Sequence, residues 1–342
     1  MERRRDGVEN KVDVRMDEII NGDSGLTEES PVETIAVLRL GTLGDMILTT
    51  PLFSALKQQY PDSHLTVIAN EWNSLIPKHH AGVDEVIAIP SGVKGVTDWI
   101  RTLRFQRFDL YIDPKDHSST TSRIVAELIR AKTKLVVPEN LPMLSSADII
   151  PPPSGLRFTD SALAPMIILA PDTEFSSRPS LQVPEPEFDL SRIAKEPFIL
   201  VNISTGGPTR RWPESKWTEF VKSVDWHGKI VILSSPGDAE SGTRIASVRE
   251  EAFYQPTKSL MEAAALVART ACVITSDTSI VHIAGALNKP IVALYFNAPK
   301  MMAKFAPLSD LQRVITAPKE LAVDVINIEE VLRACTELFI LL

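Results

Sequence analysis

The 342-residue chain has only two cysteines and lacks any apolar run near the ~20 residues that a membrane span requires. Cys272 and Cys335 lie in apolar surroundings without C-x-x-C spacing, so we expect them to pack in a core rather than to bind metal or carry redox chemistry. The charged start at residues 1–5 is not followed by the apolar region of a signal peptide. We therefore expect a soluble cytoplasmic protein, and contact with a membrane surface stays open.

Two further patterns are missing. No G-x-G-x-x-G occurs, which disfavours a nicotinamide-dependent oxidoreductase, and the six histidines show no clustered ligand spacing apart from His79-His80, so no metal site is expected. The formal charge is -8, of which residues 1–33 carry -5, from ten Asp and Glu against five Lys and Arg. The remaining body is only mildly acidic, which argues against nonspecific binding of nucleic acid.

Apolar strands and helical patterns alternate twice along the chain, which specifies parallel β-α-β units. In the first half we expect strands at 35–39, 64–69, 86–89, 109–112 and 135–137 and helices at about 45–59, 95–105 and 119–131. In the second half we expect strands at 198–203, 229–234, 271–275 and 290–296 and helices at 214–225, 239–249, 259–268 and 279–287. The pattern predicts an α/β protein with two Rossmann-like, doubly wound domains facing each other across a cleft.

Proline marks the boundary between these halves, because residues 138–197 contain 11 of the 25 prolines. The expected organisation has five parts: a mobile acidic extension at 1–33, an N-terminal domain at 34–150, a proline-rich interdomain region at 151–197, a C-terminal domain at 198–327, and a helix at 328–342 that packs back across the hinge.

The segment R-L-G-T-L-G-D, from Arg39 to Asp45, is the most informative stretch, because it lies where a strand turns into a helix. Ligands dock at such turns in open α/β sheets. Asp45 has two interpretations. It can stabilise the helix N-terminus, an effect worth ~0.3–1 kcal/mol, or it can project into the cleft as a general base.

Two later segments carry groups suited to a phosphate. Thr205 and Gly206 follow the strand at 198–203, and small residues there let backbone amides approach phosphate oxygens. In S-D-T-S-I-V-H, which starts at Ser276, Asp277 is expected to cap a helix, and the amides of Thr278 and Ser279 can face an anion. His282 follows one turn later, as a ligand-site residue or as a packed core residue.

Three segments in this order, including Gly206-Gly-Pro-Thr-Arg-Arg-Trp-Pro213, resemble the bacterial lipopolysaccharide heptosyltransferases, glycosyltransferase family 9. The resemblance covers about residues 34–340. It implies the GT-B fold, with the acceptor on the N-terminal domain and the nucleotide-sugar on the C-terminal domain. It also implies Asp45 as base and Arg210 as a cation on the diphosphate, against the alternative of Arg210 as a surface arginine.

The implied reaction is inverting, metal-independent transfer of a heptose or related sugar from an ADP-sugar to a lipopolysaccharide-core or similar glycan. A metal-independent route also fits the absence of D-x-D, and no cofactor is expected beyond the donor. Glu240 follows a strand, where it either binds ribose hydroxyls or is a helix N-terminal acid. Arg39, Lys115, His117 and Arg123 are candidate acceptor-binding residues, and a glycolipid acceptor would bring contact with the inner membrane.

Two positions depart from the family pattern. Arg210 replaces the usual lysine, and Ser279 replaces the usual glycine of D-T-G-x-x-H. Arginine remains charged and binds phosphate bidentately, so the role is retained with altered geometry. A noncatalytic nucleotide-sugar-binding protein that keeps the fold is the alternative, which retention of Asp45 disfavours.

Overall fold

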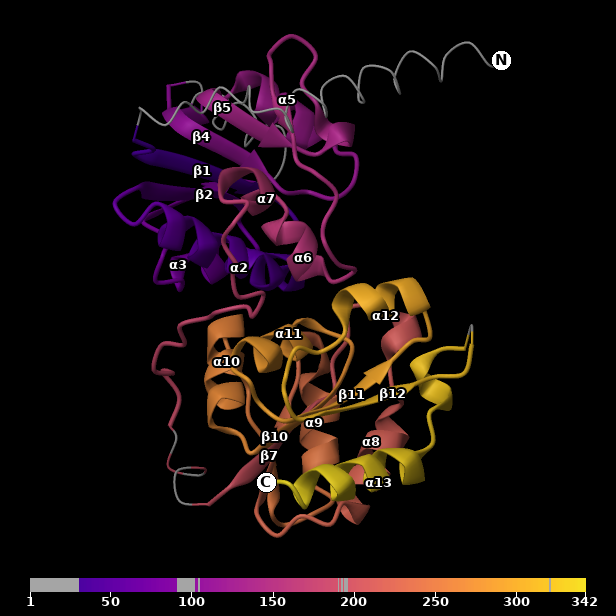
Figure 1. Ribbon diagram of the computed structural model, residues 1–342. Helices are drawn as coiled ribbons and strands as arrows, with labels where there is room; N and C mark the ends of the chain where they lie inside the picture. Colours follow the sequence, from indigo (N-terminus) through magenta and orange to yellow (C-terminus); the bar gives the residue numbers. More distant parts are fainter. Residues whose placement is uncertain are drawn as a thin grey trace.

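The computed structural model describes residues 31–342 except 91–101, 104, 190, 192, 194, 195 and 320. Within these residues the chain forms two six-stranded sheets, each with all strand pairs parallel (Figure 1). The first sheet contains β1 (Thr34–Arg39), β2 (His64–Asn70), β3 (Glu85–Ile89), β4 (Arg107–Asp113), β5 (Arg130–Val136) and β6 (Asp148–Ile149). The second contains β7 (Phe198–Asn202), β8 (Lys229–Leu233), β9 (Ala252–Tyr254), β10 (Cys272–Ser276), β11 (Ile291–Tyr295) and β12 (Gln312–Thr316).

Both sheets have the same doubly wound order. The strands run β3-β2-β1-β4-β5-β6 in the first sheet and β9-β8-β7-β10-β11-β12 in the second. Ligands bind such sheets at the carboxyl ends of the strands where the order reverses. In this protein those points are the ends of β1 and β4, at Arg39 and Asp113, and the ends of β7 and β10, at Asn202 and Ser276.

Helices cover both faces of the first sheet. Because side chains alternate along a strand, Ile35 and Val37 pack on one face of β1, and Ala36 and Leu38 pack on the other. The first face is covered by α2 (Leu43–Gln59), α3 (Leu75–Lys78), α6 (Phe158–Leu163) and α7 (Met166–Leu169), and the second by α5 (Thr120–Leu128). Burial on both sides explains the nearly continuous apolar strands.

The second sheet is layered in the same way. One face packs against α10 (Leu260–Arg269) and α11 (Ser279–Ala286), and the other against α8 (Glu214–Ser223), α9 (Ala239–Ala246) and α13 (Ile328–Phe339). Trp212 and Trp217 lie in the second of these layers with ring centroids 4.7 Å apart, so both pack in the core. Cys272 and Cys335 are buried there too, as expected.

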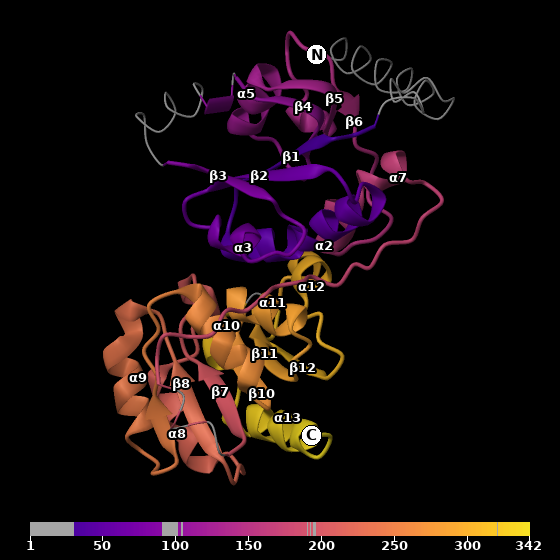
Figure 2. The same cartoon turned by 90° about the vertical axis from the view of Figure 1, so that its left-hand side faces the viewer.

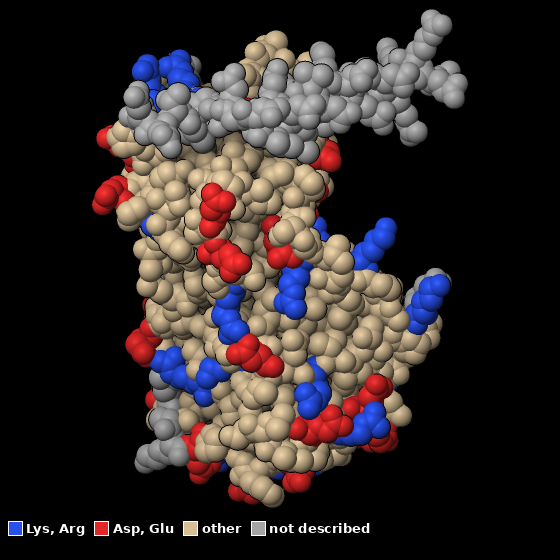
Figure 3. Space-filling view, viewed as in Figure 1, with Lys and Arg blue, Asp and Glu red and all other residues tan. Residues whose placement is uncertain are grey.

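The two domains meet through helices. Helix α2 contacts α11, and apolar residues of both domains form one continuous cluster. Figure 1 shows α2 and α6 facing α11 and α12 (Pro299–Phe305). Figure 2 shows the extended segment after α7 running along the molecule to the second domain. On the face shown in Figure 3, Lys and Arg lie among Asp and Glu instead of forming one basic surface.

Helix α2 continues through Pro51, which has no amide hydrogen to donate to the carbonyl four residues earlier. The hydroxyl of Thr50 donates instead to that carbonyl, on Ile47, over 2.7 Å. The local sequence Thr-Pro therefore satisfies the buried backbone and keeps the helix intact, as expected for a proline that does not end this element.

Several expectations need correction. The helix expected at 119–131 ends at Leu128, because Arg130 and Ala131 pair with β4 as the start of β5 and Ile129 alone connects the two elements. The sequence pattern missed the short elements β6, β9, α3, α6, α7, α12 and β12. Most of the helix expected at 95–105, and residues 1–30 of the expected mobile extension, lie outside the described residues.

The expected packing of the C-terminal helix across the hinge is wrong. Helix α13 contacts α8, β11 and β12, and its buried residues belong to the core of the second domain. Its apolar stripe packs against the sheet face next to it, within the second domain. In the region expected to connect the domains, α6 and α7 instead pack on α2 of the first domain. No helix of the described residues is long and apolar enough to cross a membrane.

Candidate active site

The turn between β1 and α2 holds Asp45 in a fixed orientation. Thr42 is the N-cap of α2: its hydroxyl accepts from the amide of Asp45 at 3.2 Å, and its own amide donates to Asp45 Oδ2 at 3.0 Å. A Cβ on Gly41 would lie 2.7 Å from that oxygen, so glycine is required for the carboxylate to fold back over the turn. Asp45 is a helix-capping acid and is still 24% exposed.

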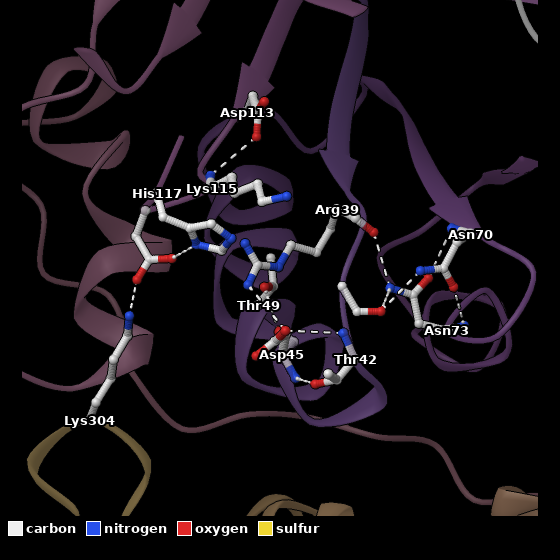
Figure 4. A network of polar contacts seen from close by, with 12 residues as sticks. Arg39, Thr42, Asp45, Thr49, Asn70, Asn73, Asp113, Lys115, His117 and Lys304 are labelled. Carbon is white, nitrogen blue, oxygen red and sulfur yellow. Dashed lines mark hydrogen bonds and ion pairs between the residues drawn. The ribbon is translucent and has the colours of Figure 1, made fainter. Parts of the chain in front are cut away.

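Arg39 lies behind this carboxylate, almost fully buried. Its Nη2 is 3.9 Å from Asp45 Oδ2 (Figure 4). Its guanidinium carbon lies 4.6 Å from the ring centroid of Phe158. Burial lowers the pKa of Arg39, and the nearby carboxylates of Asp45, Asp116 and Asp113 oppose that shift. Since arginine remains charged at any physiological pH, this group supplies a permanent positive charge behind Asp45.

Asp113 ends β4 at the same crevice and is completely buried. Its Oδ1 accepts from the amide of Lys115 at 3.1 Å. Burial raises its pKa to about 6, although hydrogen bonds and the charges of Arg39 and Lys115 act in the opposite direction. This carboxyl group therefore changes its protonation state near physiological pH. It lies two and four residues before the candidate acceptor-binding residues Lys115 and His117.

The loop after β4 reaches toward the other domain. Asp116 contacts His117 Nδ1 at 3.1 Å and forms an ion pair with Lys304 of α12 (Figure 4). Phe305 of α12 packs against Phe158, with ring centroids 5.4 Å apart. Lys115 and His117 thus lie in the loop that contacts α12, next to Arg39.

Arg123 does not join them. It lies on α5, where it lines a separate apolar hollow together with Ile124, Met143 and Leu144. Because α5 covers the sheet face opposite α2, this position is remote from the turn that holds Asp45.

On the C-terminal side, the loop after β7 has an open surface. A Cβ on Gly206 or Gly207 would meet nothing within 4 Å, so these glycines are not required by packing inside the protein. Thr205 donates its hydroxyl to the carbonyl of Gly207 at 3.0 Å, which holds the loop. The empty space beside the two glycines leaves room for a ligand to approach the backbone closely.

Arg210 is 41% exposed, and its Nη1 lies 3.4 Å from Asp277 Oδ2. Burial raises the pKa of Asp277, and the charge of Arg210 opposes the shift. The side-chain cap of α11 belongs to Thr278, whose backbone is extended and whose hydroxyl accepts from the amide of Ile280, so the expected capping by Asp277 is wrong. Ser279 is the first residue of that helix.

His282 connects the two halves of the site. It lies on α11, is nearly buried, and approaches α2 so closely that a Cβ on Gly44 would be 2.7 Å from its Cδ2. Burial lowers its pKa to about 4, with Asp45 opposing the shift and Arg210 adding to it. The imidazole is therefore neutral at pH 7 and lies within electrostatic reach of both Asp45 and Arg210.

A cavity of about 470 Å³ opens between the domains beside these residues, within the ~300–1,000 Å³ typical of small-molecule sites. Both domains line it: Thr42, Leu43 and Gly44 from the first, and Asn202, Ser204, Thr205, Gly206, Arg210, Ser235, Leu260, Asp277, Thr278, Ser279, Ile280 and His282 from the second. The sequence interpretation missed Asn202, Ser204 and Ser235, although each is a polar residue at the carboxyl end of an apolar strand.

Glu240 is not among the residues that line the cavity. Its side chain is 94% exposed and its contact is an ion pair with Arg244, one turn further along α9. Nearer to the cavity, Asp238 accepts a hydrogen bond from Ser204 at 2.6 Å and holds that loop in place. The described residues contain no group of three or more His, Cys, Asp or Glu side chains that could hold a metal ion.

Comparison with known proteins agrees with this architecture. A model of glycosyltransferase family 9 (heptosyltransferase) matches residues 161–329. Lipopolysaccharide heptosyltransferase 2 of Salmonella typhimurium is 26% identical over 312 residues, covering 82% of this chain and 87% of that protein. Lipopolysaccharide heptosyltransferase 3 of Escherichia coli is 22% identical over 274 residues, covering 74% and 80%.

Solved structures show the same fold. A family 9 glycosyl transferase from Veillonella parvula superposes with a TM-score of 0.76 at 21% identity, covering 92% of this chain and all of that one. ADP-heptose lps heptosyltransferase II of E. coli superposes with a TM-score of 0.71 at 23% identity, covering 90% and 99%. The fold is therefore GT-B, as expected, and the resemblance to the heptosyltransferases of glycosyltransferase family 9 is confirmed.

Proposed function

We propose that this protein transfers a heptose from an ADP-heptose donor to a hydroxyl group of a lipopolysaccharide-core acceptor, with inversion at the anomeric carbon and without a metal ion. The observation that carries the proposal is that Asp45 and Arg210 both act on the charge of His282, beside a cavity lined by the turn that precedes Asp45 and by Arg210 and His282 of the other domain. A carboxylate on one side and a cation with helix amides on the other are what a single in-line displacement needs.

In this mechanism Asp45 removes the proton of the acceptor hydroxyl as its oxygen attacks the anomeric carbon. The bond between that carbon and the phosphate oxygen breaks, and ADP leaves with the electron pair. Arg210 and the amides around Thr205 and Thr278 stabilise the negative charge on the departing diphosphate. Thr42 and Arg39 both engage Asp45 through Oδ2, so Oδ1 is the oxygen suited to take the proton.

The acceptor would lie on the N-terminal domain. Arg39, Lys115 and His117 gather at the carboxyl ends of β1 and β4, where they suit the phosphates or carboxylates of a lipopolysaccharide core. Arg123 is left out, because it faces the hollow on α5. An enzyme with this substrate would work in the cytoplasm at the inner membrane, in which the lipid part of the acceptor is embedded.

The test measures ADP release from ADP-heptose with a lipopolysaccharide-core acceptor for the wild type and Asp45→Asn. Asparagine keeps an oxygen to accept from the amide of Thr42 but cannot serve as a base, so we expect a loss of about 10²- to 10⁴-fold in kcat with donor binding retained.

Asp160→Asn is the matched control. Asp160 is also the third residue of its helix, α6, and also accepts from the N-cap amide, at 2.9 Å. It should lose stability without a comparable loss of rate. Donor binding without any turnover that depends on Asp45 would instead support the noncatalytic nucleotide-sugar-binding protein.

A further inference from the structure

Trp72 is an exposed aromatic side chain beside the turn that holds Asp45. It lies two residues after the end of β2, and its side chain is 77% exposed. Because β2 runs parallel to β1 and pairs with it, its carboxyl end lies at the same edge of the sheet as Arg39. A single exposed tryptophan is not unusual in itself, so its meaning depends on how the chain presents it.

The turn that carries Trp72 is tied to the turn that carries Asp45. Asn70 and Asn73 each donate their amide N–H to the other's side-chain oxygen, at 3.0 and 2.8 Å. Asn70 Nδ2 donates to the carbonyl of Gly41 at 2.9 Å, and Asn73 Nδ2 donates to the carbonyls of Arg39 and Gly41 at 3.1 and 3.3 Å (Figure 4).

These five hydrogen bonds hold the backbone on both sides of Trp72 relative to the turn that carries Asp45. Gly41, which accepts two of them, approaches Asp45 so closely that an added Cβ would lie 2.7 Å from its Oδ2. A backbone held in this way presents the indole from a fixed point near Asp45, so little backbone order has to be gained when a ligand binds.

The neighbours of Trp72 indicate which ligand suits it. Its neighbours along the chain, Asn70, Glu71 and Asn73, are polar, whereas a segment that inserts into lipid is expected to carry further apolar side chains. A pyranose ring offers one face of C–H groups with hydroxyls around its edge. This matches a flat apolar indole surrounded by polar groups.

We propose that Trp72 is the stacking platform for a sugar ring of the acceptor glycan, next to the ring whose hydroxyl faces Asp45. The proposal rests on the proposed function, since it takes the acceptor to be a glycan. It assigns an acceptor subsite at the end of β2, one strand away from the crevice between β1 and β4. The donor lies on the other domain, so donor binding does not depend on Trp72.

The kinetic test compares wild type, Trp72→Ala and Trp72→Phe, with a delipidated lipopolysaccharide-core oligosaccharide as acceptor. We expect Trp72→Ala to raise the acceptor KM about tenfold, the size of one aromatic contact. Trp72→Phe should recover part of that loss. The KM for ADP-heptose and the kcat at saturating acceptor should stay unchanged. Phe105→Ala is the control, because Phe105 is an aromatic with 71% exposure that precedes β4, at the opposite edge of the sheet.

A second measurement needs no turnover. The delipidated oligosaccharide, added without donor, should change the tryptophan fluorescence of the wild type and of Phe105→Ala, and this change should be absent in Trp72→Phe. If no ADP is released by the wild type, the proposed function fails, and this titration still tests Trp72. The proposal is overturned by an unchanged acceptor KM and an unchanged fluorescence response in the variants. It is equally overturned by a defect seen with the lipid-bearing acceptor but not with the delipidated one, which would make Trp72 a membrane contact.

Discussion

Gly44→Ala is expected to weaken the contact between the two domains without lowering the stability of either domain. Gly44 is the second residue of α2 and is buried against the other domain. An added Cβ would lie 2.7 Å from Cδ2 and 3.3 Å from Nε2 of His282, closer than two carbon atoms can approach. The imidazole is itself buried and has little room to turn away.

Two effects compete in this variant. Alanine is better than glycine inside a helix by up to ~1 kcal/mol, while an extra methyl group in a packed site costs ~1–3 kcal/mol. The strain lies between the domains, so a small separation of α2 from α11 relieves it without unfolding either one. We therefore expect a melting temperature at or above that of the wild type. Each closure of the site, however, presses the added methyl group against His282, which costs free energy. At ~1.36 kcal/mol per tenfold, a cost of ~1–3 kcal/mol lowers kcat/KM by about 5- to 150-fold.

Gly242→Ala is the matched control. Gly242 is also a buried helical glycine, and its Cβ would lie 2.6 Å from Cδ2 of Tyr254, again an aromatic ring. Both residues belong to the second domain, so the strain cannot be relieved by domain separation. This variant should melt at a lower temperature and keep its kcat/KM once folded. The reasoning is refuted if Gly44→Ala keeps the wild-type kcat/KM, or if both glycine variants lose stability equally and rate equally.

Three further changes test other parts of the site. Arg210→Gln should lower kcat by about 10²- to 10³-fold, whereas Arg210→Lys should retain most activity because it keeps a cation for the diphosphate; equal rates for both in the ADP-release assay would contradict this role. Burial raises the pKa of Asp113 from its ordinary value of 3.8 to about 6 in the folded protein, so this burial costs almost no stability below pH 4 and about 3 kcal/mol above pH 6. Asp113→Asn should therefore stabilise the protein more at pH 7.5 than at pH 4.5 in urea unfolding, and a pH-independent difference would disprove the linkage. Lys304→Met removes the ion pair with Asp116 between the domains, so it should increase the radius of gyration in X-ray scattering and raise KM several-fold, and an unchanged radius would show that the pair does not hold the domains together.

The sequence predicted most of the fold because the strands are buried on both faces and the helices between them are amphipathic. It failed where an element depends on partners far along the chain. The three residues of β9 carry no pattern of their own and form a strand because Phe253 pairs beside Val231 of β8. Similarly, α13 was expected at the hinge because an apolar stripe reveals that a helix packs, but not against which surface.

The candidate site shows the same difference between features that the sequence predicts and features that depend on distant partners. Arg210, Thr278 and His282 line one cavity, and Asp45 lies within electrostatic reach of His282, because each follows a strand end and parallel strands bring these ends to one edge of each sheet. Glu240 satisfies the same rule, yet its side chain turns toward Arg244 and away from the cavity. The position of a residue after a strand is thus predictable, whereas the direction of its side chain depends on the partners that the fold provides.

Asp45 shows why the sequence alone left two interpretations of one residue open. Helix capping and proton abstraction are these two interpretations, and in the proposed mechanism the first prepares the second. The amide of Thr42 and the guanidinium of Arg39 both engage Oδ2, and together they prevent the carboxylate from rotating. A base held in one orientation needs no reorganisation when the acceptor hydroxyl arrives, which is where enzymes gain much of their rate. The glycine at position 41, the threonine cap and the buried arginine are therefore parts of one arrangement, which in the proposed mechanism leaves the second oxygen of the carboxylate for the proton of the acceptor.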